Sequence, residues 1–270
     1  LFMLQKLLLW FIHLNPSSKR WFWRKWYNVF ARKAQNSDFR FMNYGYDEDG
    51  FLPDLSVEDE EERYPIHLYH HVATQVELIG KKVLEVGSGR GGGASYLARY
   101  LSTESVHGID LSSAAIELCE EIHAVENLSF SEGDSEDIPF DDGFFDIVLN
   151  VESSHCYGDV DQFLSEAYRV LKPGGYFLWC DLRSRNDVEN VDRQFRLSGL
   201  EEMQTQDITT HIISALEKMS EKRKEAISSA VPRIFQKLFE SYAGVKDSRV
   251  YNSFKDGSLV YLSAALKRPE

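Results

Sequence analysis

The chain has 270 residues, of which 43% are hydrophobic and 13% are aromatic. This composition excludes a disordered chain and suffices for the core of one large domain with appended segments. The net charge is −13, yet no acidic residue precedes Asp38, so residues 1–37 carry +7 and the rest of the chain carries −20. Because duplex binding depends on a basic footprint, this acidic body speaks against nucleic acid as a partner.

The first 33 residues form a basic, aromatic arm. Its apolar run, residues 1–14, is interrupted by polar side chains and is shorter than the roughly 20 apolar residues that a membrane-spanning helix needs. Residues 19–27 read KRWFWRKWY, and this mixture of aromatic rings and cations suits the headgroup layer of a membrane. We therefore expect peripheral membrane contact through residues 1–33. The alternative is an amphipathic helix that packs on the domain as an N-terminal lid.

Cysteine and histidine patterns predict no metal site. The three cysteines form neither a CxxC pair nor a disulfide framework, which favours a reducing, cytoplasmic location. The membrane contact expected for the arm would place the protein peripherally on a membrane surface. His67, His70 and His71 fall on one expected helix, with His67 and His71 four residues apart. Neither the glutamate of an HExxH motif nor a nearby cysteine accompanies them, so we expect no metal.

From Tyr64 onward the pattern alternates between strands and helices, as in a parallel sheet covered on both faces. Residues 184–245 are expected to be mostly helical and to cap the sheet. Residues 250–254 and 258–266 are expected to pair as a closing antiparallel hairpin. The other expected elements are helices over 65–78, 93–101, 113–123 and 160–171, and strands over 82–86, 105–109, 128–132, 145–150 and 176–181.

The predicted fold class is therefore α/β, with a Rossmann-like, mostly parallel sheet and an antiparallel C-terminal hairpin. Residues 64–270 form the expected catalytic domain, and residues 1–63 contain the arm followed by an aromatic lid segment. An open sheet of this kind binds its ligand outside the carboxyl ends of its strands. The functional residues are expected at those ends.

A glycine-rich loop follows the first expected strand. Within VLEVGSGRGGG (83–93), Gly87, Gly89 and Gly92 satisfy a GxGxxG pattern, which occurs in dinucleotide-binding proteins and is weak evidence by itself. Glycines let the backbone approach a ligand closely, and the helix start behind them favours an anionic group. Asp110 ends the next strand, 23 residues after Gly87, where its carboxylate can accept hydrogen bonds from ribose hydroxyls. These features alone leave NAD and S-adenosylmethionine both open.

Three further features separate the two cofactors: Glu85 before the first glycine, EGDSEDIPF (132–140) after the third strand, and LKPGG (171–175) before the fifth. In this combination the chain resembles the class I S-adenosylmethionine-dependent methyltransferases from about Tyr64 to its end. The resemblance implies S-adenosyl-L-methionine as the cofactor. It implies that the glycine loop holds the methionine end, Asp110 the ribose and Asp134 the adenine amino group. The full set of expected cofactor-binding residues is Glu85, Gly87, Ser88, Gly89, Asp110, Leu111, Asp134, Ser135, Glu136, Asn150 and Tyr44.

A histidine follows the fourth expected strand, close to where the transferred methyl group should point. Methyl transfer mainly needs in-line positioning, but a hydroxyl acceptor also needs a base. We expect His155 to be that base, since imidazole titrates near neutrality, and Asp181 at the end of the fifth strand to orient the ring. The alternative is an ordinary loop histidine beside a capping carboxylate. Glu152 and Tyr157 are less specific candidates for ligand contact.

The segment FMNYGY (41–46) combines aromatic residues with a glycine. Similar segments in small-molecule methyltransferases fold over the cofactor and exclude water, which makes Tyr44 and Tyr46 lid candidates. Ordinary aromatic packing is the alternative.

A narrower resemblance rests on NYGYDEDG (43–50), LYHHVATQVEL (68–78), VLEVGSGRGGGASYLAR (83–99), FDIVLNVESSHCY (145–157) and RVLKPGGYFLWCDLR (169–183). Over residues 21–200 the chain is similar to the mycobacterial phthiotriol and phenolphthiotriol dimycocerosate methyltransferases. This implies O-methylation of a hydroxyl on a small hydrophobic acceptor, such as a lipid, a polyketide or an isoprenoid-like molecule. Left open are C-methylation of a sterol or prenyl chain with Glu152 and Tyr44 around a carbocation, N-methylation, a non-catalytic Rossmann-type binding protein, and an NAD-dependent dehydrogenase.

Overall fold

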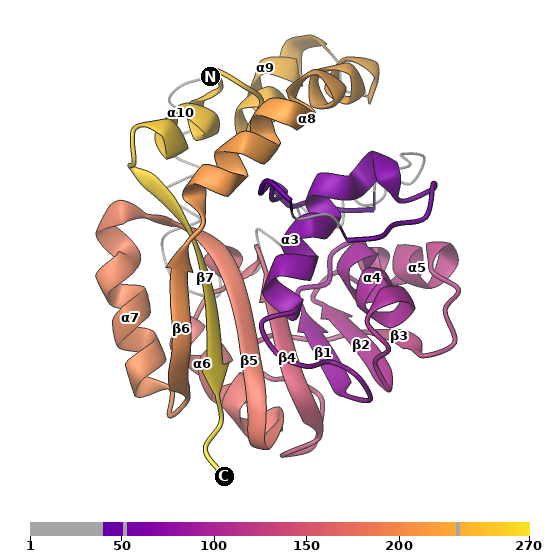
Figure 1. The fold of residues 1–270 in the computed structure, drawn as a ribbon, viewed down its shortest axis with the longest axis vertical. Coiled ribbons are helices and arrows are strands. Elements are labelled where there is room, and N and C mark those ends of the chain that lie inside the picture. Colours follow the sequence, from indigo (N-terminus) through magenta and orange to yellow (C-terminus); the bar gives the residue numbers. More distant parts are fainter. Residues whose placement is uncertain (1–39, 51–52, 231–232) are drawn as a thin grey trace.

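The computed structural model describes residues 40–50, 53–230 and 233–270 (Figure 1). The basic arm, residues 1–33, lies outside the described residues, and so does the membrane contact expected for it. The lid candidates Tyr44 and Tyr46 are described. Among the described helices, none is both long and apolar enough to cross a membrane.

Seven strands form one sheet in the order β3-β2-β1-β4-β5-β7-β6. Neighbours from β3 to β5 are parallel, whereas β7 runs antiparallel to both β5 and β6. Parallel strands covered on both faces are buried along their length, as the first strand shows. The strands are β1 (Lys82–Val86), β2 (Ser105–Asp110), β3 (Leu128–Glu132), β4 (Phe145–Val151), β5 (Leu171–Ser184), β6 (Glu201–Asp207) and β7 (Leu259–Lys267).

Two apolar clusters fill the two faces of the sheet. On one face, α3 (Arg63–Ala73), α4 (Gly92–Tyr100) and α5 (Ser113–Ile122) pack on the strands. On the other face lie α6 (Val160–Val170) and α7 (Val188–Leu197), which contribute Phe163 and Phe195. Val83 and Leu84 of β1 belong to opposite clusters, because successive side chains of a strand point to opposite faces.

Three helices lie over the carboxyl ends of the parallel strands in Figure 1, namely α8 (Thr209–Ala230), α9 (Arg233–Tyr242) and α10 (Arg249–Lys255). Three short 3-10 turns complete the elements: η1 (Glu60–Glu62), η2 (Ser154–Cys156) and η3 (Arg185–Asp187). The lid segment lies against this cap, since the Asp47 amide donates to the carbonyl of His211 in α8. The ligand-binding end of the sheet is therefore covered.

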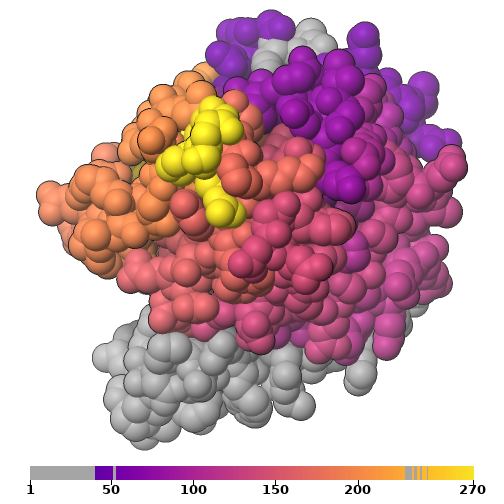
Figure 2. Space-filling model, turned by 90° about the horizontal axis from the view of Figure 1, so that it is seen from below, coloured from indigo at the N-terminus to yellow at the C-terminus, as the bar shows by residue number. Residues whose placement is uncertain are grey.

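The opposite end of the molecule is visible in Figure 2, where the C-terminal residues, in yellow, lie on the surface. Here the amide of Gly174, which has a φ of 75°, donates to the carbonyl of Arg268. The Arg268 guanidinium donates in turn to the carbonyls of Tyr168 and Arg169. The LKPGG turn therefore packs against the end of β7, far from the cap.

The fold class predicted from the sequence is confirmed: the sheet is mostly parallel and ends in antiparallel strands. The expected partner of the last strand is wrong, however, because residues 250–254 belong to α10. Tyr251 and Phe254, three residues apart, are both buried on one face of this helix, and the Ser248 side chain caps its start. The true partner is β6, which lies within the segment expected to be mostly helical. All its side chains are exposed, so no alternation marks it.

Candidate active site

The glycine loop joins β1 to α4 at the point where the strand order reverses. In an open α/β sheet, the loops that leave β1 and β4 there diverge to opposite faces and open a crevice. Gly87 has a φ of 79°, and a Cβ at this position would lie 2.5 Å from Ser153 Oγ and 2.8 Å from the Tyr157 hydroxyl oxygen. Both residues follow β4, so the two loops meet, and only glycine permits this approach.

Asp110 lies at the tip of β2, beside the glycine loop. Its Oδ2 accepts a hydrogen bond of 2.9 Å from the Gly89 amide, and its Oδ1 accepts one of 2.9 Å from the Ser112 amide. Burial raises its pKa to about 6, and the two amides oppose this rise. The structure thus brings together the loop and the carboxylate that the sequence placed in one site, with Leu111 between Asp110 and Ser112.

Three buried polar atoms at this crevice have no hydrogen-bond partner among the described residues: Glu85 Oε2, Ser88 Oγ and Asn150 Oδ1. Leaving such an atom unpaired costs about 1–3 kcal/mol. The other oxygen of Glu85 accepts a 2.6 Å hydrogen bond from Tyr69, and burial raises the pKa of Glu85 to about 8. These atoms fit a ligand with polar groups of its own, such as an amino acid joined to a nucleoside.

The loop after β3 has a tight local structure. Asp134 Oδ1 accepts a 3.0 Å hydrogen bond from the Glu136 amide. The Glu136 carboxylate accepts hydrogen bonds of 2.9 Å from the amides of Gly158 and Asp159, so this side chain anchors the loop before α6. Contacts of Asp134, Ser135 and the Glu136 backbone with an adenine ring stay a prediction.

His155 and Asp181 are in direct contact. His155 Nδ1 lies 2.7 Å from Asp181 Oδ1, and the His155 amide donates a 2.8 Å hydrogen bond to Asp181 Oδ2. Asp181 is fully buried, whereas the His155 side chain is about one-third exposed. The structure therefore places His155 and Asp181 in the contact that the sequence predicted, and the His155 ring is partly accessible to a ligand.

The charges of this pair reinforce one another. Burial alone would raise the pKa of Asp181, but Arg183 and then His155 hold it well below its usual range. Burial would lower the pKa of His155, but Cys156 and Asp181 outweigh it and place that pKa well above its ordinary value. Asp181 is thus ionised, and the His155 ring is a strong base once it has lost its proton.

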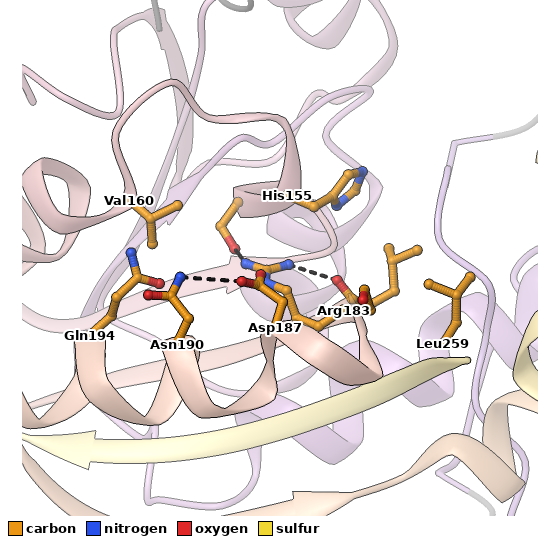
Figure 3. A pocket seen from close by; sticks show the side chains of 10 residues that line it. His155, Val160, Arg183, Asp187, Asn190, Gln194 and Leu259 are labelled. Carbon is orange, nitrogen blue, oxygen red and sulfur yellow. Dashed lines mark hydrogen bonds between the residues drawn. The ribbon is translucent and has the colours of Figure 1, made fainter. Parts of the chain in front are cut away.

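A pocket of about 300 Å³ opens beside this pair, between η2, the end of β5 and α7 (Figure 3). The ring of His155 points away from Asn190 and Gln194 of α7, while Arg183 lies between them. Polar residues outnumber apolar ones in its lining. The lining residues are Ser154, His155, Val160, Leu182, Arg183, Ser184, Asp187, Asn190, Gln194 and Leu259.

Glu152 forms a second buried contact at the end of β4. Its Oε2 accepts a 2.9 Å hydrogen bond from the Tyr44 amide and a 2.7 Å hydrogen bond from the Tyr261 hydroxyl. Its φ of 49° is unusual for a residue other than glycine, and such strain is often found at functional sites. Burial raises the pKa of Glu152 to about 7. The Tyr44 ring meets Phe254 edge-on at 5.8 Å, so the lid and the cap close over Glu152.

Sequence reasoning missed the cap residues of this contact. Tyr261, Phe254 and Arg223 come from β7, α10 and α8, and no motif marks them. The Arg223 guanidinium donates a 2.8 Å hydrogen bond to the Asn43 carbonyl and lies 5.9 Å from the Tyr44 ring centre. Arg223 is one of several basic residues in α8, so the sequence gives no signal that singles it out.

The lid segment is held by histidines of the core and the cap. The Tyr46 ring stacks on His71 at 4.4 Å and lies 4.9 Å from His211. The Asp47 carboxylate accepts hydrogen bonds from Ser214 and Lys218 of α8. His71 of α3 therefore packs against the lid segment. No group of three or more potential metal ligands occurs in the part of the chain that the structure describes.

Comparison with known proteins agrees with this geometry. A family model described as a methyltransferase domain matches residues 84–179. The chain belongs to the class I S-adenosylmethionine-dependent methyltransferases, and its cofactor is S-adenosyl-L-methionine.

Two curated relatives show the likeness in detail. The chain is 39% identical to the phthiotriol/phenolphthiotriol dimycocerosates methyltransferase of Mycobacterium tuberculosis over 92% of each chain. It is 38% identical to the fatty-acid O-methyltransferase of Mycolicibacterium smegmatis, over 90% of this chain and 88% of that one.

Solved structures share the fold at low identity. The geranyl diphosphate C-methyltransferase of Streptomyces coelicolor A3(2) has a TM-score of 0.66 at 19% identity, covering 93% of this chain and 97% of that one. The cyclase SpnF has a TM-score of 0.71 at 18% identity, covering 91% and 94%. Since a cyclase shares the fold, the reaction follows from the site and not from the architecture.

Proposed function

We propose that this methyltransferase transfers a methyl group to a hydroxyl oxygen of a small hydrophobic, lipid-like acceptor, with His155 as the general base. The observation that carries the proposal is the 2.7 Å contact between His155 Nδ1 and Asp181 Oδ1. His155 lies in the loop after β4, whose residues Ser153 and Tyr157 approach Gly87. Both curated relatives described above are named for acceptors of a lipid kind, and one is named an O-methyltransferase.

The cofactor supplies an electrophilic methyl group on a positively charged sulfur. Asp181 holds the proton on His155 Nδ1, which leaves Nε2 to accept the proton of the acceptor hydroxyl. The oxygen becomes nucleophilic as it loses that proton, and the protein holds it in line with the methyl group. Glu85, Asp110 and Asn150 would hold the cofactor.

The cap supports a hydrophobic acceptor. Ile212 and Leu216 of α8 are buried in the cluster that includes Phe254 and Tyr261. These side chains cover the carboxyl ends of the strands next to Glu152 and Tyr44. Ile212 and Leu216 are fully buried in the structure, so an acceptor chain would reach them only after the cap moves, and it would then gain about 25 cal/mol for each square ångström that it buries.

The test measures methyl transfer from labelled cofactor to long-chain alcohols, diols and fatty acids. His155→Asn keeps the size of the side chain but removes the base, so we expect turnover with hydroxyl acceptors to fall at least 100-fold while cofactor binding is retained. The matched control is His107→Gln, because His107 contacts Ser129 and Ser131 within the sheet. Unchanged turnover of His155→Asn would overturn the assignment of the base.

C-methylation is the second candidate, and the contacts of Glu152 favour it. Glu152 accepts from the Tyr44 amide and the Tyr261 hydroxyl, and the Phe254 ring packs against both tyrosine rings. A carboxylate beside aromatic rings is suited to stabilise a carbocation. In this case Glu152→Gln would abolish transfer to a prenyl acceptor, and His155→Asn would leave it intact. The opposite pattern favours oxygen methylation.

A further inference from the structure

Arg183 lies on the same face of β5 as Trp179 and Asp181. Residues two apart in a strand share a face, and the Arg183 guanidinium lies 5.2 Å from the centre of the Trp179 ring. Its Nη1 lies 2.9 Å from Asp181 Oδ2, the oxygen that also accepts the His155 amide. Only 7% of Arg183 is exposed. A buried cation therefore contacts the carboxylate that contacts the base.

The guanidinium is fixed by further hydrogen bonds. Nη1 donates to the Leu182 carbonyl oxygen at 2.7 Å, and Nη2 donates to Ser154 Oγ at 2.7 Å. Ser154 in turn donates to Asp181 Oδ2 at 2.7 Å and accepts from the Trp179 indole at 2.9 Å. Arg183 and Asp181 thus share one rigid network, in which the guanidinium cannot turn away from the carboxylate.

The charge around His155 explains why a cation is needed there. Besides Arg183, the titratable groups that face the ring or line the adjoining pocket are Glu152 after β4, Cys156 from η2, Asp181 from β5 and Asp187 from η3. Cys156 and Asp181 raise the pKa of His155 and so favour a protonated imidazole. A ring that stays protonated cannot accept a proton from an acceptor. Arg183 is the cation in direct contact with Asp181, and its positive charge disfavours the protonated form of the His155 imidazole.

We propose that Arg183 is a positioning residue that moderates the basicity which Asp181 confers on His155, so that the ring can lose its proton and serve as a base. Asp181 still fixes the orientation and tautomer of the ring, while the guanidinium offsets part of its charge. Arg183 does not touch the reacting atoms. The inference rests on the proposed role of His155, and it adds the residue that tunes it.

The first test measures the pKa of His155 by NMR titration of its ring in the wild-type protein and in Arg183→Met. Removal of a cation this close is expected to raise that pKa by about one unit or more. The matched control is Arg185→Met, because the exposed Arg185 lies two residues further along the chain and contacts Asp207 and the Gly257 carbonyl oxygen. An unchanged or lowered pKa in Arg183→Met overturns the proposal.

Two further variants keep the test decisive if Arg183→Met does not fold, since breaking a buried ion pair strongly destabilises a protein. Arg183→Gln removes the charge but keeps amide donors for Ser154 and the Leu182 carbonyl, and it is expected to raise the pKa of His155 as Arg183→Met does. Arg183→Lys keeps the charge and is expected to restore a pKa near that of the wild type. Equal pKa values for the Gln and Lys variants would show that charge at position 183 is not what matters.

The pH profile of kcat/KM separates this inference from the proposed function. If both hold, the rising limb of the profile moves to higher pH in Arg183→Met by the same amount as the pKa of His155, and the plateau at high pH is retained. A shifted pKa with an unmoved limb means that His155 is not the base, so the proposed function fails. If the pKa of His155 is unshifted and His155→Asn loses activity, the assignment of His155 as the base is retained and the proposed role of Arg183 is wrong.

Discussion

The Tyr261 hydroxyl donates a 2.7 Å hydrogen bond to Glu152, joining the last strand of the sheet to the end of β4, 109 residues earlier in the chain. The same carboxylate oxygen accepts the Tyr44 amide from the lid. One buried carboxylate therefore ties the lid, the central sheet and the C-terminal strand together at the site.

We expect Tyr261→Phe to destabilise the protein more at high pH than at low pH. The hydroxyl favours the ionised form of Glu152, so its loss raises the pKa of Glu152 further above 7 and leaves a buried charge with fewer donors. The expected loss at pH 8.5 is about 1–3 kcal/mol, and it is smaller at pH 5.5, where Glu152 is protonated. Denaturant unfolding at the two pH values measures it. Tyr176→Phe on β5 is the control, and equal losses at both pH values would contradict the prediction.

A second prediction about pH concerns the stability contributed by Glu85. Its folded-state pKa of about 8 lies above the ordinary value of 4.5, so the folded protein binds a proton that the unfolded chain releases. The stability that this proton confers is fully present below pH 4.5 and is lost as pH rises through about 8, by on the order of 5 kcal/mol. Thermal unfolding of the cofactor-free protein should show a flatter dependence on pH for Glu85→Gln. Parallel curves would show that Glu85 does not titrate differently on folding.

Asp110→Ala should weaken cofactor binding by at least tenfold, because hydrogen bonds to a charged group are worth about 1.5–3 kcal/mol. Isothermal calorimetry with S-adenosylmethionine and S-adenosylhomocysteine measures this loss. Glu132→Ala is a matched control, since Glu132 ends the neighbouring strand with an exposed side chain. Full affinity of Asp110→Ala would place the ribose elsewhere.

The basic arm leads to a prediction that depends on the sequence alone. The protein should float with anionic liposomes at low salt, and deletion of residues 1–33 should abolish flotation while methyl transfer to a soluble acceptor is retained. Raising the salt should release the full chain, because charge attraction is screened. Equal recovery of the full chain and the deletion variant in the liposome-free fraction would contradict a membrane role for the arm.

The sequence by itself was sufficient to predict the parallel half of the sheet and the glycine loop of the cofactor site. Buried strands and amphipathic helices carry strong periodicity, and Gly87, Asp110 and Asp134 are close to strand ends in the chain. His155 and Asp181 could be paired because the carboxyl ends of adjacent parallel strands must meet at one edge.

Only the tertiary structure decided the antiparallel edge and the surroundings of Glu152. β6 has fully exposed side chains, and its strand conformation is due to hydrogen bonds with β7 and not to its own residue pattern. Tyr261, Phe254 and Arg223 reach the site from three distant elements, and such contacts depend on packing that no local spacing records. The sequence therefore determined the cofactor chemistry, while packing across distant segments determined what surrounds Glu152 and which charges lie beside His155.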